Sequence, residues 1–181
     1  MHTSLLLAVK KTPDEPDDHG LGRSRGGFSS KIHIVCDGHG NPLNAVITGG
    51  HRNDAAIFEQ ALRSIHLHKE RGRPRTKPKK LIADKGYDFS TVRQHLRQRK
   101  IKAVIPPKRL PDTWKCHKRG PKPTTDFKLY KERNRIERFI GWMKNCRRIA
   151  TRFEKYASSF LIMVKLSFIK FFLKNYFSDT A

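Results

Sequence analysis

The order of hydrophobic and polar positions along the chain predicts an α/β domain, in which a hairpin is followed by helix, strand, helix, strand and long helix. Alternating positions over residues 31–35 and 43–48, with turn-forming residues 37–42 between them, predict the β-hairpin. Apolar residues at helical spacing then predict a helix over residues 55–65, and Asp54 is expected to be its N-cap.

Two short apolar runs in the middle of the chain predict a pair of buried strands. The first covers residues 81–83 and ends at Asp84, and the second covers residues 103–105. A helix capped by Ser90 or Thr91 is expected between them. Strand, helix and strand joined by short links are typical of a parallel βαβ unit.

The last third of the chain predicts two helices, over residues 127–147 and 154–177. The second helix is strongly apolar but carries Lys165 and Lys170. Since a membrane span needs about 20 largely uncharged residues, this pattern favours a buried amphipathic helix and no membrane partner.

Composition divides the chain into a polar segment over residues 1–21 and one domain over residues 22–181. The 39 Lys and Arg outnumber the 16 Asp and Glu, and the net charge of +23 makes nucleic acid the default partner. An enzyme for an acidic substrate is disfavoured, because it would need only a basic pocket and not an excess of positive charge over the whole chain. Basic loops at residues 67–80 and 106–125 are expected to contact a DNA backbone, with a merely solubilising surface as the alternative. Scattered cysteines without a CxxC pair favour a reducing cytoplasm.

The helix over residues 127–147 carries two neighbouring stripes. At about 100° per residue, its polar stripe is formed by Tyr130, Arg133, Glu137 and Lys144. The adjacent apolar stripe is formed by Ile136, Phe139, Ile140 and Met143. The helix is therefore expected to pack on a core and to present a carboxylate between cations at the edge of its packed face.

Asp84 is expected where α/β sheets bind ligands, at the C-terminal end of a strand. Together with Glu137 it could hold Mg²⁺, which prefers oxygen ligands, for metal-assisted chemistry at a phosphodiester. From spacing alone a simpler interpretation is favoured, in which Glu137 pairs with Arg133 on the surface and Asp84 only starts a helix.

Several separate blocks follow one another in the order seen in one group of proteins. The spacing Tyr-x2-Arg-x3-Glu-x6-Lys is complete at Tyr130, Arg133, Glu137 and Lys144. Further blocks lie at residues 22–27, 31–33, 83–88, 104–107 and 147–152. From about residue 10 to its end, the chain resembles the catalytic domain of bacterial insertion-sequence transposases of the DDE superfamily. The resemblance implies a ribonuclease H-like mixed sheet flanked by helices.

The resemblance also implies a chemistry. Asp84 and Glu137 correspond to catalytic, metal-binding carboxylates, with Mg²⁺ or Mn²⁺ as the cofactor. The family reaction is cleavage of double-stranded DNA at the element ends by water, followed by attack of the freed 3′-hydroxyl on target DNA. The implied DNA contacts are Tyr130, Arg133, Lys144, Arg23, Arg25, Arg147 and Arg148. A homo-oligomer assembled on DNA, in the bacterial cytoplasm at the nucleoid, is implied as well.

The beginning of the chain departs from the family. The first catalytic aspartate of the family lies on the first, central strand, before the block at residues 22–27, and no Asp here precedes Asp14. We therefore expect a domain truncated at its N-terminus, with that strand missing or replaced, and no cleavage or joining of DNA by this chain alone. The apolar residues 5–9 could pair into the vacant position. A non-catalytic DNA-binding remnant or regulator is the alternative, and an unrelated RNA-binding protein is a more remote one.

Two other candidate sites are weaker. Residues 23–27 are rich in Gly and Arg like a phosphate loop, but no Gly-Lys-Ser or Gly-Lys-Thr follows them. A zinc site could be formed by His33, Cys36, His39 and His51. In an alternating strand, however, His33 and Cys36 point to opposite faces, which disfavours the zinc site.

Overall fold

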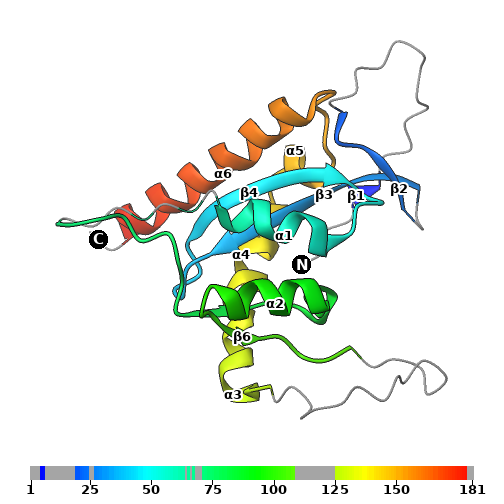
Figure 1. Cartoon of the computed structure of the whole chain (residues 1–181). Coiled ribbons are helices and arrows are strands. Elements are labelled where there is room, and N and C mark those ends of the chain that lie inside the picture. The colour runs from blue at the N-terminus through cyan, green and yellow to red at the C-terminus, as the bar shows by residue number, and fades with distance from the viewer. Residues whose placement is uncertain are drawn as a thin grey trace.

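The computed structural model describes residues 5–6, 19–24, 27–63, 65, 67, 71–108 and 125–178. Strand β3 (Gly27–Cys36) is the central strand of the larger sheet, with partner strands on both of its edges (Figure 1). It pairs antiparallel with β4 (Pro42–Gly49), and the turn between them confirms the predicted hairpin. Strand β2 (Gly22–Ser24) also pairs antiparallel with β3, and β1 (Leu5–Leu6) pairs on the opposite edge from β2.

The second sheet contains β5 (Lys80–Ile82) and β6 (Lys102–Val104), which pair in parallel. The 3₁₀ turn η2 (Lys85–Tyr87) and helix α2 (Ser90–Gln98) connect the two strands. This arrangement confirms the predicted βαβ unit. Ser90 is the first helical residue rather than the cap, because Phe89 takes the N-cap position without a side-chain capping bond.

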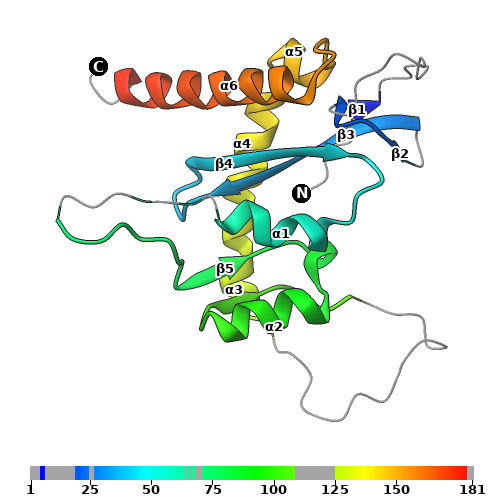
Figure 2. The ribbon, with the colours of Figure 1, turned by 45° about the horizontal axis from the view of Figure 1, so that its top comes forward.

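Two hydrophobic clusters lie on the two faces of the β3–β4 ribbon. Alternate residues of β3 serve both, since Ile32 packs into one cluster and Val35 against the other. One cluster joins the ribbon to α4, α5 and α6, and the other joins it to α1, α2 and the β5–β6 pair. Figure 2 shows the β3–β4 ribbon between α6 and α1, with α4 crossing behind the ribbon toward α3.

Helix α1 (Asp54–Arg63) begins differently from the prediction. Asp54 is its first residue, and the Asn53 side chain instead accepts a hydrogen bond of 3.1 Å from the Ala55 N–H. The Asp54 carboxylate lies 3.4 Å from Nζ of Lys31 on β3. Asn53 therefore caps the helix, which leaves Asp54 to tie it to the sheet.

The long helix expected over residues 127–147 consists of three consecutive segments. They are α3 (Phe127–Tyr130), the 3₁₀ turn η4 (Lys131–Arg133) and α4 (Asn134–Lys144). Backbone angles at the junctions stay right-handed, so the axis continues through a tightened turn. Cys146 then takes an extended conformation (ψ 102°), which ends the helix before the short helix α5 (Arg147–Ala150). The prediction of one uninterrupted helix to residue 147 was wrong in this respect.

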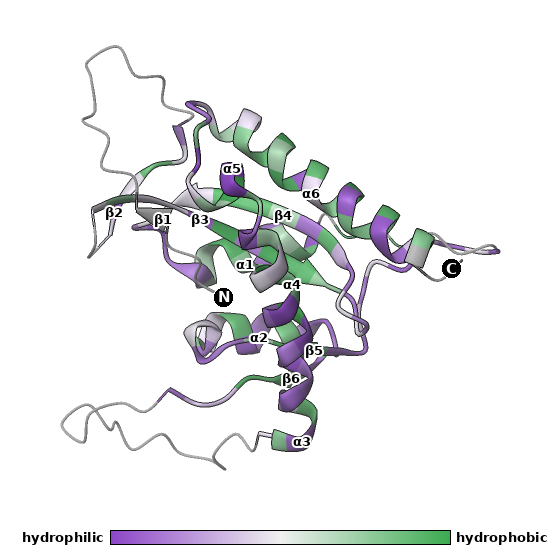
Figure 3. Cartoon of the chain, turned by 180° about the vertical axis from the view of Figure 1, so that it is seen from behind, coloured by the Kyte–Doolittle hydropathy of each residue, from purple (hydrophilic) through white to green (hydrophobic). Residues whose placement is uncertain are grey.

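Helix α6 (Ala157–Ser178) packs through a buried stripe that includes Phe160, Val164 and Phe168. Figure 3 shows polar and apolar positions mixed along its length. Within the described part of the chain, no helix combines the length and the low charge needed to cross a membrane.

Candidate functional site

Asp84 follows strand β5 and begins the turn η2. Its Oδ1 accepts a hydrogen bond of 2.7 Å from the Lys85 N–H, so the side chain caps the turn. The strand and the cap together fix where the carboxylate lies, and its second oxygen remains available to other groups. The side chain is about one quarter exposed, at 25%.

Glu137 lies in the first turn of α4, and core packing determines the direction in which it points. Phe139, Ile140 and Met143 of the same helix are buried, and Ile136 is partly buried against them, as the apolar stripe predicts. Glu137 consequently lies at the edge of the packed face, with 39% of its side chain exposed.

Arg133 brings the two carboxylates together. Its Nη2 lies 2.9 Å from Glu137 Oε1 and 4.0 Å from Asp84 Oδ2. Its Nη1 donates to Tyr130 Oη at 3.3 Å, and its guanidinium lies 5.7 Å from the centre of the Tyr130 ring. Asp84, which is distant in sequence, thus forms one cluster with Tyr130, Arg133 and Glu137. The simpler interpretation of a Glu137–Arg133 ion pair is also correct, and Asp84 belongs to the same network.

A buried polar chain that sequence reasoning missed fixes the turn carrying Asp84. Tyr87 Oη lies 3.3 Å from His33 Nδ1, and His33 Nε2 lies 2.9 Å from Thr48 Oγ1. Burial raises the pKa of Tyr87, and the charges of Asp54 and Asp84 raise it further. The turn after β5 is thereby anchored to β3 and β4. The signal available in the sequence was that His33 and Tyr87 both fall within the blocks at residues 31–33 and 83–88.

The zinc hypothesis gains no support from these contacts. Both ring nitrogens of His33 already face hydroxyl groups. Burial raises the pKa of the Cys36 thiol to about 12, with the charge of Asp37 adding to the effect, and zinc binds the thiolate form. Within the described residues, no group of three or more His, Cys, Asp or Glu side chains is arranged to hold a metal ion.

Comparison of the chain with known proteins identifies its family. Residues 6–169 match the family model described as a transposase DDE domain. The chain belongs to the transposase DDE domain family. This membership confirms the resemblance to insertion-sequence transposases and agrees with the mixed α/β fold.

Two curated transposase-family proteins are similar to the chain. The putative transposase for insertion sequence element IS402 from Burkholderia cepacia is 35% identical over 157 residues, covering 86% of this chain and 65% of that protein. The putative transposase for insertion sequence element IS6501 from Brucella ovis is 34% identical over 140 residues, covering 77% of this chain and 95% of that protein. The chain thus spans less than two thirds of the Burkholderia protein. No solved structure matches.

Within the described residues of this DDE domain, the other residues expected to contact DNA lie on exposed surface. Lys144 is exposed at the end of α4, and Arg23 is exposed on β2. Arg147 and Arg148 are exposed on α5, where Arg148 Nε lies 3.2 Å from Glu154 Oε1. Arg25 lies outside the described residues.

The predicted basic loops are described only in part. Residues 71–80 of the first loop are largely exposed. Residues 109–124 of the second loop, like residues 7–18 near the N-terminus, lie outside the described residues.

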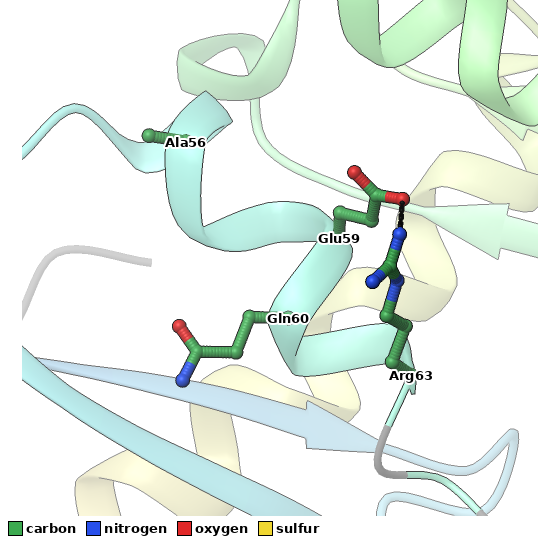
Figure 4. Close-up of a pocket in the computed structure, with 4 residues that line it drawn as sticks. All are labelled: Ala56, Glu59, Gln60 and Arg63. Carbon is green, nitrogen blue, oxygen red and sulfur yellow. Dashed lines mark hydrogen bonds and ion pairs between the residues drawn. The ribbon is translucent and has the colours of Figure 1, made fainter.

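A shallow surface hollow on α1 involves none of the predicted site residues. It is lined by Ala56, Glu59, Gln60 and Arg63 (Figure 4). Within it, Arg63 Nη2 lies 2.5 Å from Glu59 Oε1 in an exposed pair one helical turn apart. Because this hollow contains none of the residues predicted to act on DNA or metal, the candidate functional site is the cluster of Asp84, Tyr130, Arg133 and Glu137.

Proposed function

We propose that this domain acts in DNA transposition, in Mg²⁺-dependent cleavage and strand transfer of double-stranded DNA at the ends of a mobile element. The observation that carries this proposal is the convergence of Asp84 and Glu137 on the single guanidinium of Arg133, in a chain of the transposase DDE domain family. Two carboxylates, one after a strand end and one on a packed helix, that approach the same cation support a metal-assisted chemistry at a phosphodiester.

The residues present suit Mg²⁺ or Mn²⁺. Both ions prefer oxygen ligands, and Mg²⁺ is commonly held by one or two carboxylates together with waters and phosphate oxygens. Asp84 and Glu137 supply such oxygens from partly exposed side chains that approach the same cation, Arg133. When bound, the metal supplies activation of the attacking oxygen and charge stabilisation of the leaving oxygen.

We assign Tyr130 and Arg133 of the cluster, together with Lys144 at the end of α4, to DNA binding. Tyr130, Arg133 and Lys144 form a stripe that binds phosphates close to the carboxylates, because the hydroxyl, guanidinium and ammonium groups all donate hydrogen bonds. We also assign to DNA binding Arg23 on β2 and Arg147 and Arg148 on α5. Arg25, the fourth arginine expected to contact DNA, lies outside the described residues. DNA bound along these elements would present its backbone to Asp84 and Glu137, in a homo-oligomer assembled on the element ends.

We assign the two sheets to one ribonuclease H-like domain over residues 22–181, in which a central strand between β3 and β5 is missing or replaced. The antiparallel β3–β4 pair and the parallel β5–β6 pair support this assignment, as does their packing into a common core. The two-residue strand β1, Leu5–Leu6, pairs with Ser29 and Ser30 of β3 and contributes no carboxylate. A chain with only Asp84 and Glu137 at this site is inactive by itself in our proposal.

The second candidate function is that of a non-catalytic DNA-binding remnant or regulator. It is favoured by the 2.9 Å ion pair between Arg133 and Glu137, which satisfies the carboxylate without a metal. This function needs the basic surface and not the metal. The two functions therefore predict the same DNA affinity. They differ in whether substitution of Asp84 or Glu137 abolishes a metal-dependent cleavage activity.

DNA affinity should be weakly sequence-dependent and should fall steeply as salt rises, because phosphate contacts release counterions. Filter binding to two unrelated duplexes at several salt concentrations measures this. Lys144→Gln should reduce the salt slope by about 1, as expected for one lost phosphate contact. Lys170→Gln, which removes the same charge from an exposed position on α6, should change the slope less. Binding that is insensitive to salt would contradict the DNA function in both forms.

A further inference from the structure

One nitrogen of Arg133 contacts both carboxylates of the candidate metal site. Nη2 lies 2.9 Å from Glu137 Oε1 and 4.0 Å from Asp84 Oδ2, so the guanidinium offsets one of the two negative charges of the pair. We propose that Arg133 competes with the divalent cation for these oxygens, and that DNA relieves the competition by drawing the guanidinium to a phosphate. This inference rests on the proposed function, since it takes Asp84 and Glu137 as metal ligands.

The competition follows from charge and from space. The guanidinium of Arg133 carries a positive charge and lies at both carboxylates. A divalent cation approaching Asp84 Oδ2 and Glu137 Oε1 meets this charge at the same oxygens. The cation can therefore bind well only after Arg133 has moved, and removing the guanidinium should strengthen metal binding rather than weaken it.

The position of Arg133 allows such a movement. Its side chain is 23% exposed, and its pair with Glu137 is of the i,i+4 type between partly exposed groups, which is a weak interaction. Arg133 is also the last residue of the 3₁₀ turn η4, inside an otherwise α-helical segment, and such turns often mark hinges. A DNA phosphate offers the guanidinium a two-pronged acceptor that competes well with a single carboxylate oxygen.

The consequence is coupling between DNA and metal. If DNA removes Arg133 from the carboxylates, DNA must raise the affinity for the metal, and the metal must raise the affinity for DNA by the same factor. The domain would then hold its metal tightly only where a phosphodiester is in place. Arg133 acts here as a positioning residue, and it touches the carboxylates rather than the reacting atoms.

The test measures Mn²⁺ binding to the full chain from the EPR signal of the free ion, which needs no catalytic activity. Arg133→Gln should bind Mn²⁺ about tenfold or more tightly than the unmodified chain. Arg138→Gln, the matched control, removes an equal charge from an exposed position on α4, next to Glu137 in sequence, and should have a much smaller effect. The double variant Asp84→Asn, Glu137→Gln should lose the site.

The second arm of the test adds a short DNA duplex. The unmodified chain should gain Mn²⁺ affinity when DNA is present, and Arg133→Gln should gain much less, because its competitor is already gone. Mn²⁺ that binds to the DNA itself is subtracted with the double variant and the same duplex.

The outcomes separate this inference from the function on which it rests. If Arg133→Gln binds Mn²⁺ no more tightly than Arg138→Gln, while the double variant loses the site, the competition is wrong and the metal site stands. If the double variant binds Mn²⁺ as the unmodified chain does, the metal site is wrong and the competition falls with it. Circular dichroism checks that each variant is folded, and Arg133→Lys, with intermediate affinity expected, replaces the glutamine variant if that one unfolds.

Discussion

Replacing Arg152 by alanine is expected to lower the free energy of unfolding by roughly 3 kcal/mol or more. Arg152 is only 4% exposed, and its guanidinium donates to the hydroxyl of Ser30 and to three backbone carbonyls, those of His19, Glu154 and Lys155. Its guanidinium carbon also lies 5.0 Å from the centre of the Phe160 ring. Alanine leaves several buried acceptors without donors, and each such loss costs about 1–3 kcal/mol.

Urea unfolding followed by circular dichroism measures this effect. Arg147→Ala is the matched control, because Arg147 lies on the neighbouring helix α5 and is exposed. The control should change the free energy of unfolding by about 0.5 kcal/mol or less, as substitutions of exposed residues usually do. Equal losses of stability in the two variants would show that Arg152 does not join the residues around β3 to the start of α6 as described.

The second large effect concerns catalysis. The chain as it stands should not nick supercoiled DNA above background in Mg²⁺ or Mn²⁺. The same chain preceded by a strand that carries an aspartate should nick it. The reason is electrostatic: two metal ions about 3.5–4 Å apart repel each other, and a further carboxylate between them offsets that repulsion. In the chain as it stands, β1 lies beside β3 as two leucines.

Two variants of the extended chain serve as controls for the nicking assay. Asp84→Ala and Glu137→Ala should each reduce nicking to the background. Glu132→Ala, an exposed acidic residue of η4 that pairs with Arg135, should leave it largely unchanged. Metal-dependent nicking by the unextended chain, abolished by both Asp84→Ala and Glu137→Ala, would contradict the requirement for a third carboxylate. An extended chain that does not nick would favour the remnant instead, and nicking that survives Asp84→Ala would show that the candidate site is not its source.

Periodicity predicted those parts of the fold that depend on local chemistry. The hairpin, the parallel βαβ unit and the apolar stripe of α4 follow from which residues alternate or recur at helical spacing. The Glu137–Arg133 pair could be predicted for the same reason, because residues four apart on a helix are neighbours. Asp84 was expected beside Glu137 only through the resemblance to the family, since no local rule relates a strand end to a distant helix.

Other features depend on tertiary contacts that a single sequence does not contain. Asn53 and Asp54 are both good capping residues, and it is the contact of Asp54 with Lys31 that decides between them. Nothing in the local sequence distinguishes Arg152 from an exposed arginine, because the carbonyls that it binds, such as those of His19 and Lys155, are brought to it only by the fold. The 3₁₀ turn at Arg133 interrupts a sequence whose helical spacing is continuous.

The most direct test of the central claim, that Asp84 and Glu137 share a metal ion, is a crystal structure of the chain with a short DNA duplex and Mn²⁺. Anomalous scattering locates Mn²⁺ independently of water and lighter ions. The account predicts an anomalous peak within about 2.2 Å of one oxygen from each of the two carboxylates. It also predicts that Arg133 has turned from Glu137 to a phosphate. A peak elsewhere, or none at this site with Arg133 still paired to Glu137, would contradict the claim.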